Sequence, residues 1–128
     1  MKVLLDTHVW LWYLLGDPRL SRTHRTLMED DSTDLYLSSM SVWEAHLLIE
    51  KDRLPVKSAP GVWIREALRT LQVREAGISF AIATRSRSIP VDHQDPADRF
   101  IAATALEMKM PLLTEDERLR ACPDLRCL

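Results

Sequence analysis

The chain has 128 residues, which is enough for one domain with a sizeable hydrophobic core. Its charged fraction of 28% and hydrophobic fraction of 46% are ordinary for a globular protein, and a net charge of −2 gives no overall basic field for a nucleic acid. An acid at position 6 comes too early for a signal peptide, and no apolar run approaches the ~20 residues of a membrane span. Cys122 and Cys127 form no CxxC pair. We therefore expect a single cytoplasmic domain, residues 1–128, with free thiols and no membrane contact.

Short apolar runs alternate with helical patterns along the chain. The apolar runs are typical of strands buried on both faces, and the longer segments between them are typical of helices. The predicted strands are 3–5, 35–37, 73–78, 112–114 and, as a possible fifth, 125–128. The predicted helices are 9–15, 21–31, 41–52, 62–71, 79–88, one that begins at 96 and stops before Pro111, and a short acidic turn after 114. Strands that alternate with helices indicate an α/β fold, with a parallel sheet covered on both faces.

Two of these helices have recognisable starts. Ser41 and Glu44 have the Ser-x-x-Glu spacing of a capping box. Asp95 is placed as the N-cap of the last long helix, and Pro96 as its first residue, where the missing N–H costs nothing. Asp98 then falls at the third helical position.

Four acids from separate segments are expected to meet at one edge of the sheet. In parallel sheets, ligands bind beyond the carboxyl ends of the strands. Asp6 ends the first strand, and Glu44 lies in the first turn of the helix after the second strand. The helix that carries Asp98 runs antiparallel to the fourth strand, so its start lies at the same edge. Asp116 comes two residues after the fourth strand ends.

Each acid also has a purely structural interpretation. Glu44 completes a capping box, and Asp98 and Asp116 favour helix N-termini through the macrodipole. Asp6 is harder to explain, because a carboxylate at the end of a buried strand is costly without a partner. Four like charges at one edge repel one another and raise their pKa values, and a divalent cation removes that conflict. A set of oxygen ligands without a Cys or His cluster favours Mg²⁺ or Mn²⁺, which can activate a water against a phosphate.

Other phosphate chemistries fit the sequence less well. An aspartyl-phosphate phosphatase would use Asp6 as its nucleophile and needs a second Asp two residues later, where this chain has His8. With three glycines in the chain, a P-loop is absent. Hydrolysis by a metal-activated water is the favoured reaction, and the phosphatase stays as an alternative.

Four short motifs occur in order along the chain. They are Leu4-Leu5-Asp6-Thr7, Ser38-x-x-Ser41-x-x-Glu44, His93-x-Asp95-Pro96-x-Asp98-Arg99 with Ile101-Ala102-Ala103-Thr104-Ala105, and Leu113-Thr114-x-Asp116. Together they resemble the PIN-domain nucleases and, within them, the VapC-like toxins of bacterial and archaeal toxin–antitoxin pairs. The resemblance implies a three-layer α/β/α domain whose parallel sheet of four to five strands has the order 3-2-1-4-5. It also implies a Mg²⁺- or Mn²⁺-dependent endoribonuclease, with Asp6, Glu44 and Asp98 as metal ligands and Asp116 as a more variable fourth catalytic acid. A catalytically silent binding module and a DNA nuclease are the alternatives.

Several neighbours are expected to support these acids. Thr7 and Thr114 are predicted to hydrogen-bond the carboxylates or a metal-bound water. Asp95 matches a motif acid, but an N-cap role is favoured. Arg99 either pairs with phosphate or holds the acids in place, and His93 is interpreted first as a loop-orienting residue. A basic surface for RNA is hypothesised from Arg85, Arg87 and Arg99.

The first helix is apolar nearly all round, although a surface helix needs one apolar stripe. The surplus aromatic side chains are either buried by neighbouring helices or covered by another chain. The family resemblance implies a cognate antitoxin along a groove by the first helices, and a homodimer. The predicted antitoxin contacts are Trp10, Trp12, Tyr13 and Trp43.

Overall fold

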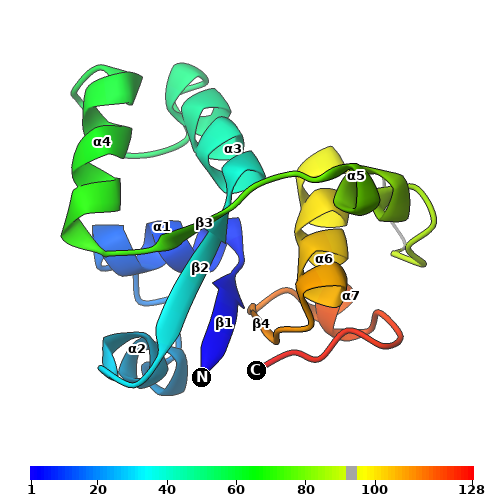
Figure 1. The fold of residues 1–128 in the computed structure, drawn as a ribbon. Coiled ribbons are helices and arrows are strands. Elements are labelled where there is room, and N and C mark those ends of the chain that lie inside the picture. Colours follow the sequence, from blue (N-terminus) through cyan, green and yellow to red (C-terminus); the bar gives the residue numbers. More distant parts are fainter. Residues whose placement is uncertain (92–94) are drawn as a thin grey trace.

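The computed structural model describes residues 1–91 and 95–128, so the predicted loop-orienting residue, His93, lies outside the described ranges. Its strands are β1 (Lys2–Leu5), β2 (Asp34–Ser38), β3 (Arg74–Ala76) and β4 (Leu112–Leu113). Its helices are α1 (Thr7–Leu15), α2 (Arg22–Glu29), α3 (Ser39–Glu50), α4 (Pro60–Thr70), α5 (Phe80–Ser86), α6 (Pro96–Met108) and α7 (Glu117–Arg120) (Figure 1). Each predicted strand and helix corresponds to one of these elements except the fifth strand.

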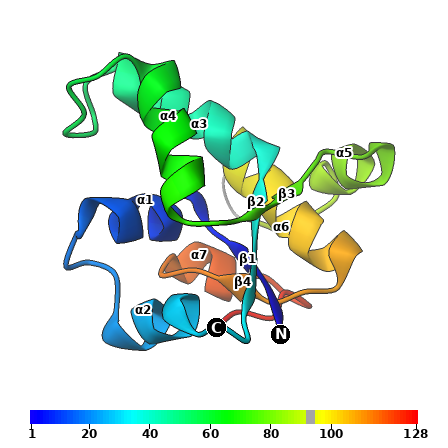
Figure 2. The same cartoon turned by 60° about the vertical axis from the view of Figure 1, so that its left-hand side comes forward.

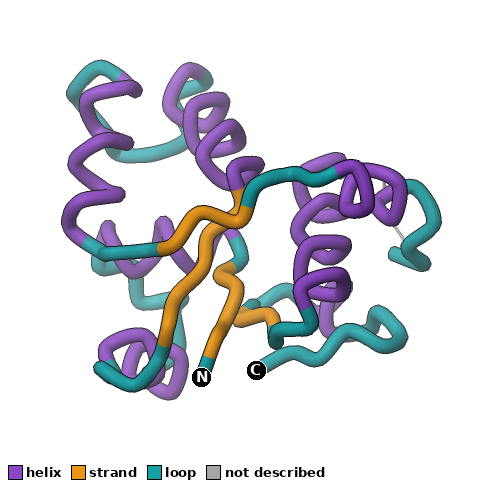
Figure 3. The backbone as a smooth tube through the Cα atoms, in the orientation of Figure 1, coloured by secondary structure: helices purple, strands orange, loops and turns teal. Residues whose placement is uncertain are grey.

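The strands form one parallel sheet of order β3-β2-β1-β4, as expected for the first four strands (Figure 3). The C-terminal segment runs beside β4 in the place of the predicted fifth strand, but it forms an isolated parallel bridge between Leu112 and Cys127. Two hydrogen bonds of 2.9 Å make this bridge, from Leu112 N to Arg126 O and from Leu128 N to Leu112 O. The sheet therefore has four strands, within the predicted range of four to five, and the possible fifth strand is reduced to this bridge because β4 is two residues long.

Side chains of β1 alternate between two hydrophobic cores, which explains why its sequence is apolar without interruption. Val3 and Leu5 pack into a core with α1, α2, α3 and α4. Leu4 packs into a second core with α5, α6 and α7. Figures 1 and 2 show the two groups of helices on opposite faces of the sheet. The predicted three-layer α/β/α architecture is confirmed.

The start of α3 differs from the prediction. Ser38, the last residue of β2, is the N-cap, and its hydroxyl accepts a hydrogen bond from Met40 N at 3.0 Å. No loop separates β2 from α3. The N-cap is Ser38 and not Ser41, the residue that the capping box predicts, so the helix begins three residues earlier. Ser41 is buried inside the first turn, and Glu44 lies in the second turn.

Other helix ends agree with the sequence. Asp95 caps α6 by accepting a hydrogen bond from Ala97 N at 3.0 Å, and Pro96 is the first helical residue. Gly16 ends α1 with φ of +65°, a backbone conformation that favours glycine. Both cysteines are free, as expected. Among the helices of the described ranges, none combines the length and apolar character that a membrane span requires.

Candidate active site

Three of the predicted acids are buried or half-buried at the carboxyl edge of the sheet. Asp6 directly follows β1 and is 3% exposed. Asp98 lies in the first turn of α6 and is 8% exposed, while Glu44 lies half-buried in the second turn of α3. Helix α3 packs against α6, which brings the last two acids toward each other across the end of β1. The strand-end rule therefore placed these acids correctly.

Burial and mutual repulsion favour the protonated forms of these acids. Burial, followed by the charges of Asp6, Asp95, Glu44 and Asp116, raises the pKa of Asp98 to about 8. Burial likewise raises the pKa values of Asp6 and Glu44 above their ordinary range. The carboxylates keep their protons because their negative charges are unfavourable in this buried site. A bound cation would compensate the same charges and so favour the ionised carboxylates.

Thr114 fixes the orientation of Asp6. Its hydroxyl donates a hydrogen bond of 2.8 Å to Asp6 Oδ2, and this bond lowers the pKa of Asp6 against the effect of burial. The same hydroxyl oxygen accepts a hydrogen bond of 3.0 Å from Asp116 N. Thr114 thus connects the acid that follows β1 to the segment that follows β4.

Thr7 and Ser41 hold Glu44 in a similar way. Their two hydroxyl oxygens are 2.8 Å apart, and a hydrogen bond from Thr7 lowers the pKa of Glu44. Since a hydroxyl carries one hydrogen, Thr7 donates to Glu44 and accepts from Ser41. The sequence reasoning assigned Ser41 to a cap and missed this role. Its signal was the spacing itself, which places Ser41 and Glu44 on neighbouring turns of one helix face.

Two carboxylate oxygens at this edge have no hydrogen-bond partner among the described residues. They are Asp6 Oδ1 and Glu44 Oε1, and both are buried. Within residues 1–91 and 95–128, no three His, Cys, Asp or Glu side chains are close enough together to form a ready metal site. The acids therefore lie within electrostatic reach of one another but do not converge on a single point.

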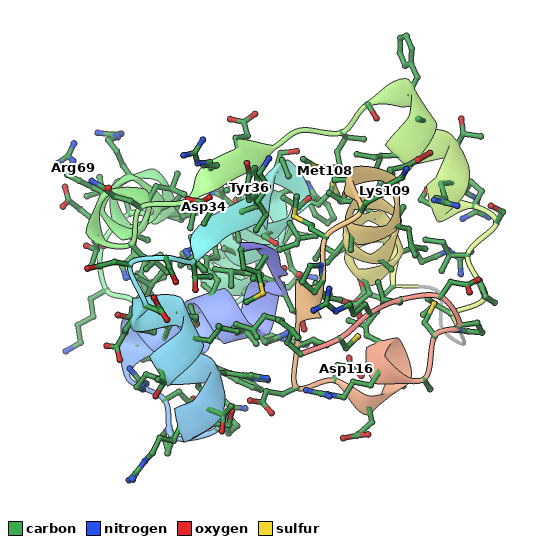
Figure 4. The ribbon with its side chains drawn as sticks, turned by 60° about the horizontal axis from the view of Figure 1, so that its bottom comes forward. Asp34, Tyr36, Arg69, Met108, Lys109 and Asp116 are labelled. Carbon is green, nitrogen blue, oxygen red and sulfur yellow. The ribbon has the colours of Figure 1, made fainter. Side chains whose placement is uncertain are left out.

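Asp116 lies at the same edge but is engaged differently. It lies beside α7 (Figure 4) and is the N-cap of that helix. Its side chain accepts a hydrogen bond of 2.8 Å from Arg118 N. An ion pair of 3.4 Å also joins its Oδ2 to the Arg118 guanidinium. Its charge still contributes to the raised pKa values of Asp6 and Asp98.

Arg99, predicted either to pair with phosphate or to hold the acids in place, is buried, which argues against the phosphate role. It is 8% exposed, and its guanidinium lies against the backbone that precedes α6. It donates hydrogen bonds of 2.9 to 3.3 Å to the carbonyl oxygens of Ser86, Arg87, Ile89 and Val91. A guanidinium in this position anchors residues 86–91 to the first turn of α6. The hypothesised basic surface therefore loses Arg99.

The aromatic residues of α1 are mostly covered within the chain. Trp10 is fully buried and packs edge-on against Trp63 with ring centroids 6.5 Å apart, so its assignment as an antitoxin contact is wrong. The Arg19 guanidinium lies 4.8 Å from the Trp12 ring, and the Arg25 guanidinium lies 5.2 Å from the Tyr13 ring. Helix α1 is therefore apolar nearly all round because one side is buried in the core and arginine side chains cover aromatic rings on the other.

Two recesses flank the acids. One, of about 310 Å³, is lined by Asp6 and Asp116 together with His8, Trp12, Arg19, Glu115 and Arg118. The other, of about 350 Å³, is lined by Glu44 and Asp95 together with Trp43, Leu47, Leu48, Lys51, Arg53, Pro96 and Ala97. Each recess therefore combines carboxylates with cations and an aromatic ring.

Comparisons with known proteins identify the family and the fold of the chain. The family model for the PIN domain matches residues 3–125. Over 120 residues the chain is 33% identical to Ribonuclease VapC22 of Mycobacterium tuberculosis, covering 93% of this chain and 90% of that protein. The crystal structure of VapBC2 from Rickettsia felis, bound to a DNA fragment from their promoter, has a TM-score of 0.74 at 14% identity, covering 100% of this chain and 98% of that one. FitAcB from Neisseria gonorrhoeae has a TM-score of 0.67 at 23% identity, covering 98% and 96%. Both solved structures share the fold of this chain.

Proposed function

The chain belongs to the PIN-domain family, and we propose that it is a metal-dependent endoribonuclease that acts as the toxin of a toxin–antitoxin pair in the cytoplasm. The observation that carries the proposal is the buried acidic edge, where burial and repulsion raise the pKa of Asp98 to about 8. The relative that shares 33% of its residues is a ribonuclease by name, which supports RNA as the substrate.

The residues at this edge fit a divalent cation. The donors are carboxylate oxygens, and buried oxygens of Asp6 and Glu44 have no hydrogen-bond partner among the described residues. Asp6, Glu44 and Asp98 would hold the ion, and an all-oxygen set suits Mg²⁺ or Mn²⁺. Because the three side chains are not grouped around one point, binding requires them to move toward each other. When bound, such an ion supplies Lewis acidity at a phosphate oxygen and lowers the pKa of water.

The chain's own residues prepare this edge for a phosphodiester. Thr114 holds Asp6 through Oδ2 and leaves Oδ1 for the cation. Thr7 hydrogen-bonds the Glu44 side chain, and Ser41 holds the Thr7 hydroxyl. Asp98 would release its proton to solvent if such an ion were bound, and the charge of the ion would compensate the acids so that the edge could accept a negatively charged phosphate.

We infer that a protein antitoxin inhibits the chain. The similar solved structures include VapBC and FitAB assemblies, which supports a partner of this kind. Of the predicted antitoxin contacts, Trp12 and Tyr13 are partly exposed and Trp43 is exposed, so these three are the contacts that we propose. A homodimer is also proposed, and light scattering of the purified chain tests it.

Cleavage of RNA by the purified, antitoxin-free chain tests the proposed function. We expect total cellular RNA or single-stranded oligonucleotides to be cut with Mg²⁺ or Mn²⁺ and left intact with EDTA. Glu44→Gln is expected to abolish cutting, whereas Glu50→Gln, an exposed position on the same helix, keeps it. Cutting that persists with EDTA or in Glu44→Gln would contradict the proposed site. Metal binding without any cutting would favour the silent binding module.

A further inference from the structure

The recess between α3 and the start of α6 contains an exposed tryptophan next to a catalytic acid. Trp43 precedes Glu44 on α3, and both line this recess of about 350 Å³. Pro96 and Ala97, at the start of α6, form the opposite wall. An aromatic ring therefore lines the same recess as Glu44, one of the proposed catalytic acids.

Trp43 is unusually exposed for a tryptophan of this chain. It is 48% exposed, whereas Trp10 is fully buried and Trp12 and Trp63 are partly buried. Large aromatic side chains contribute most to stability when they are buried, so folding alone does not account for this position. A flat ring at the wall of a recess offers a surface for another flat ring.

Two cations lie in the same recess. Lys51 is the C-cap residue of α3, seven residues after Glu44, and Arg53 comes two residues later. Both are exposed, and among the described residues neither forms an ion pair. The sequence reasoning did not identify them, although the spacing of residues 44, 47, 48 and 51 predicts a shared helix face.

We propose that this recess is a nucleotide subsite, in which a base of single-stranded RNA next to the cut stacks on Trp43 while Lys51 and Arg53 bind neighbouring phosphates. The inference rests on the proposed function and adds to it how the substrate is held. Aromatic stacking combined with a cationic groove is the usual means of binding single strands without base-specific hydrogen bonds. Such a subsite also explains how a chain with a net charge of −2 binds RNA, because the cations are local. An antitoxin that covers Trp43 would compete with RNA for the same recess.

The test combines Trp43 variants with RNA that lacks one base. We take a short RNA that the wild-type chain cuts, and place an abasic ribose at each position on either side of the cut. Trp43→Ala is expected to raise KM roughly 5- to 100-fold, and Trp43→Phe to stay within about twofold of wild type. Phe80→Ala is the matched control, since that ring is 95% exposed on α5, away from the recess. One abasic position should raise KM for the wild type by a similar factor and have no further effect on Trp43→Ala.

A second readout isolates the phosphate contacts. For single strands, each phosphate contact contributes about 0.7 to the slope of log affinity against log salt. The double change Lys51→Gln and Arg53→Gln should therefore reduce this slope by about 1.4, while Arg65→Gln, exposed on α4, leaves it unchanged.

The outcomes separate this inference from the proposed function. If the wild type cuts no RNA, the proposed function fails and the subsite falls with it. If the wild type cuts RNA and Trp43→Ala has an unchanged KM, the subsite alone is wrong. The subsite is equally wrong if Trp43→Ala changes inhibition by antitoxin and nothing else. Should Trp43→Ala fold poorly by thermal unfolding, Trp43→Leu replaces it in the same cycle.

Discussion

Replacement of Asp98 by asparagine is predicted to stabilise the metal-free protein, and to do so more strongly as pH rises. Burial and neighbouring acids raise the pKa of Asp98 from its ordinary 3.8 to about 8. The folded state therefore binds this proton more tightly than the unfolded chain does. Below about pH 4 both states are protonated and no stability is lost. Stability then falls as pH rises from 4 to 8, and the loss is complete above the folded pKa.

The size of the effect follows from the difference between the two pKa values. The two pKa values differ by about 4, and each pKa unit corresponds to about 1.36 kcal/mol. The ionisation of Asp98 can therefore lower the free energy of unfolding by at most about 5 to 6 kcal/mol. The neighbouring acids take up protons as Asp98 ionises, which relieves part of the repulsion. We therefore expect about half of this limit, roughly 2 to 3 kcal/mol, for a neutral amide at pH 9.

Urea unfolding of EDTA-treated protein at pH 5, 7 and 9 measures this effect. The stability difference between Asp98→Asn and wild type should grow across this series. Asp31→Asn, an exposed acid far along the chain from the site, should show no such trend. Added Mn²⁺ should stabilise the wild type most at pH 9 and the variant little. A stability difference that does not vary with pH would refute the electrostatic interpretation of this edge.

Three further changes test individual contacts. Thr114→Val removes the 2.8 Å hydrogen bond to Asp6 and should weaken Mn²⁺ binding about 10- to 100-fold, measured by calorimetry; unchanged affinity would contradict the positioning role. Trp10→Ala should destabilise the fold by about 3 to 5 kcal/mol in urea unfolding, since the ring is fully buried; a loss below 1 kcal/mol would contradict that burial. Arg99→Met leaves buried carbonyl groups unpaired and should cost about 3 kcal/mol or more, whereas the exposed Arg87→Met should cost little.

The fold was predictable because its signals are local and repeated. Apolar runs mark strands that are buried on both faces, and this pattern gave the parallel sheet and its layers. The place of Asp6, Glu44 and Asp98 followed from topology alone, since strand ends and helix starts of a parallel sheet share one edge. The N-cap at Asp95 followed from its position before Pro96.

The errors concern residues whose role depends on partners outside the motif in which each was interpreted. Arg99 is adjacent to an acid in sequence, but the carbonyl groups of residues 86–91 surround its guanidinium. Trp10 belongs to a helix that is apolar all round, and it is buried in a core that includes Trp63, more than fifty residues away. Ser41 has the spacing of a cap, yet Ser38 caps first because β2 runs directly into α3. The contacts of Arg99 and Trp10 are not visible in the local pattern, whereas Ser38 was visible and the Ser-x-x-Glu spacing was given more weight.

The most direct test of the acidic edge as a metal site is anomalous X-ray scattering from crystals soaked in Mn²⁺. The predicted result is a Mn²⁺ peak beyond the end of β1, bound by carboxylate oxygens of Asp6 and Asp98, with Glu44 drawn toward it. At a Mn²⁺ concentration that supports RNA cutting, a peak elsewhere, or none at this edge, would contradict the proposed site.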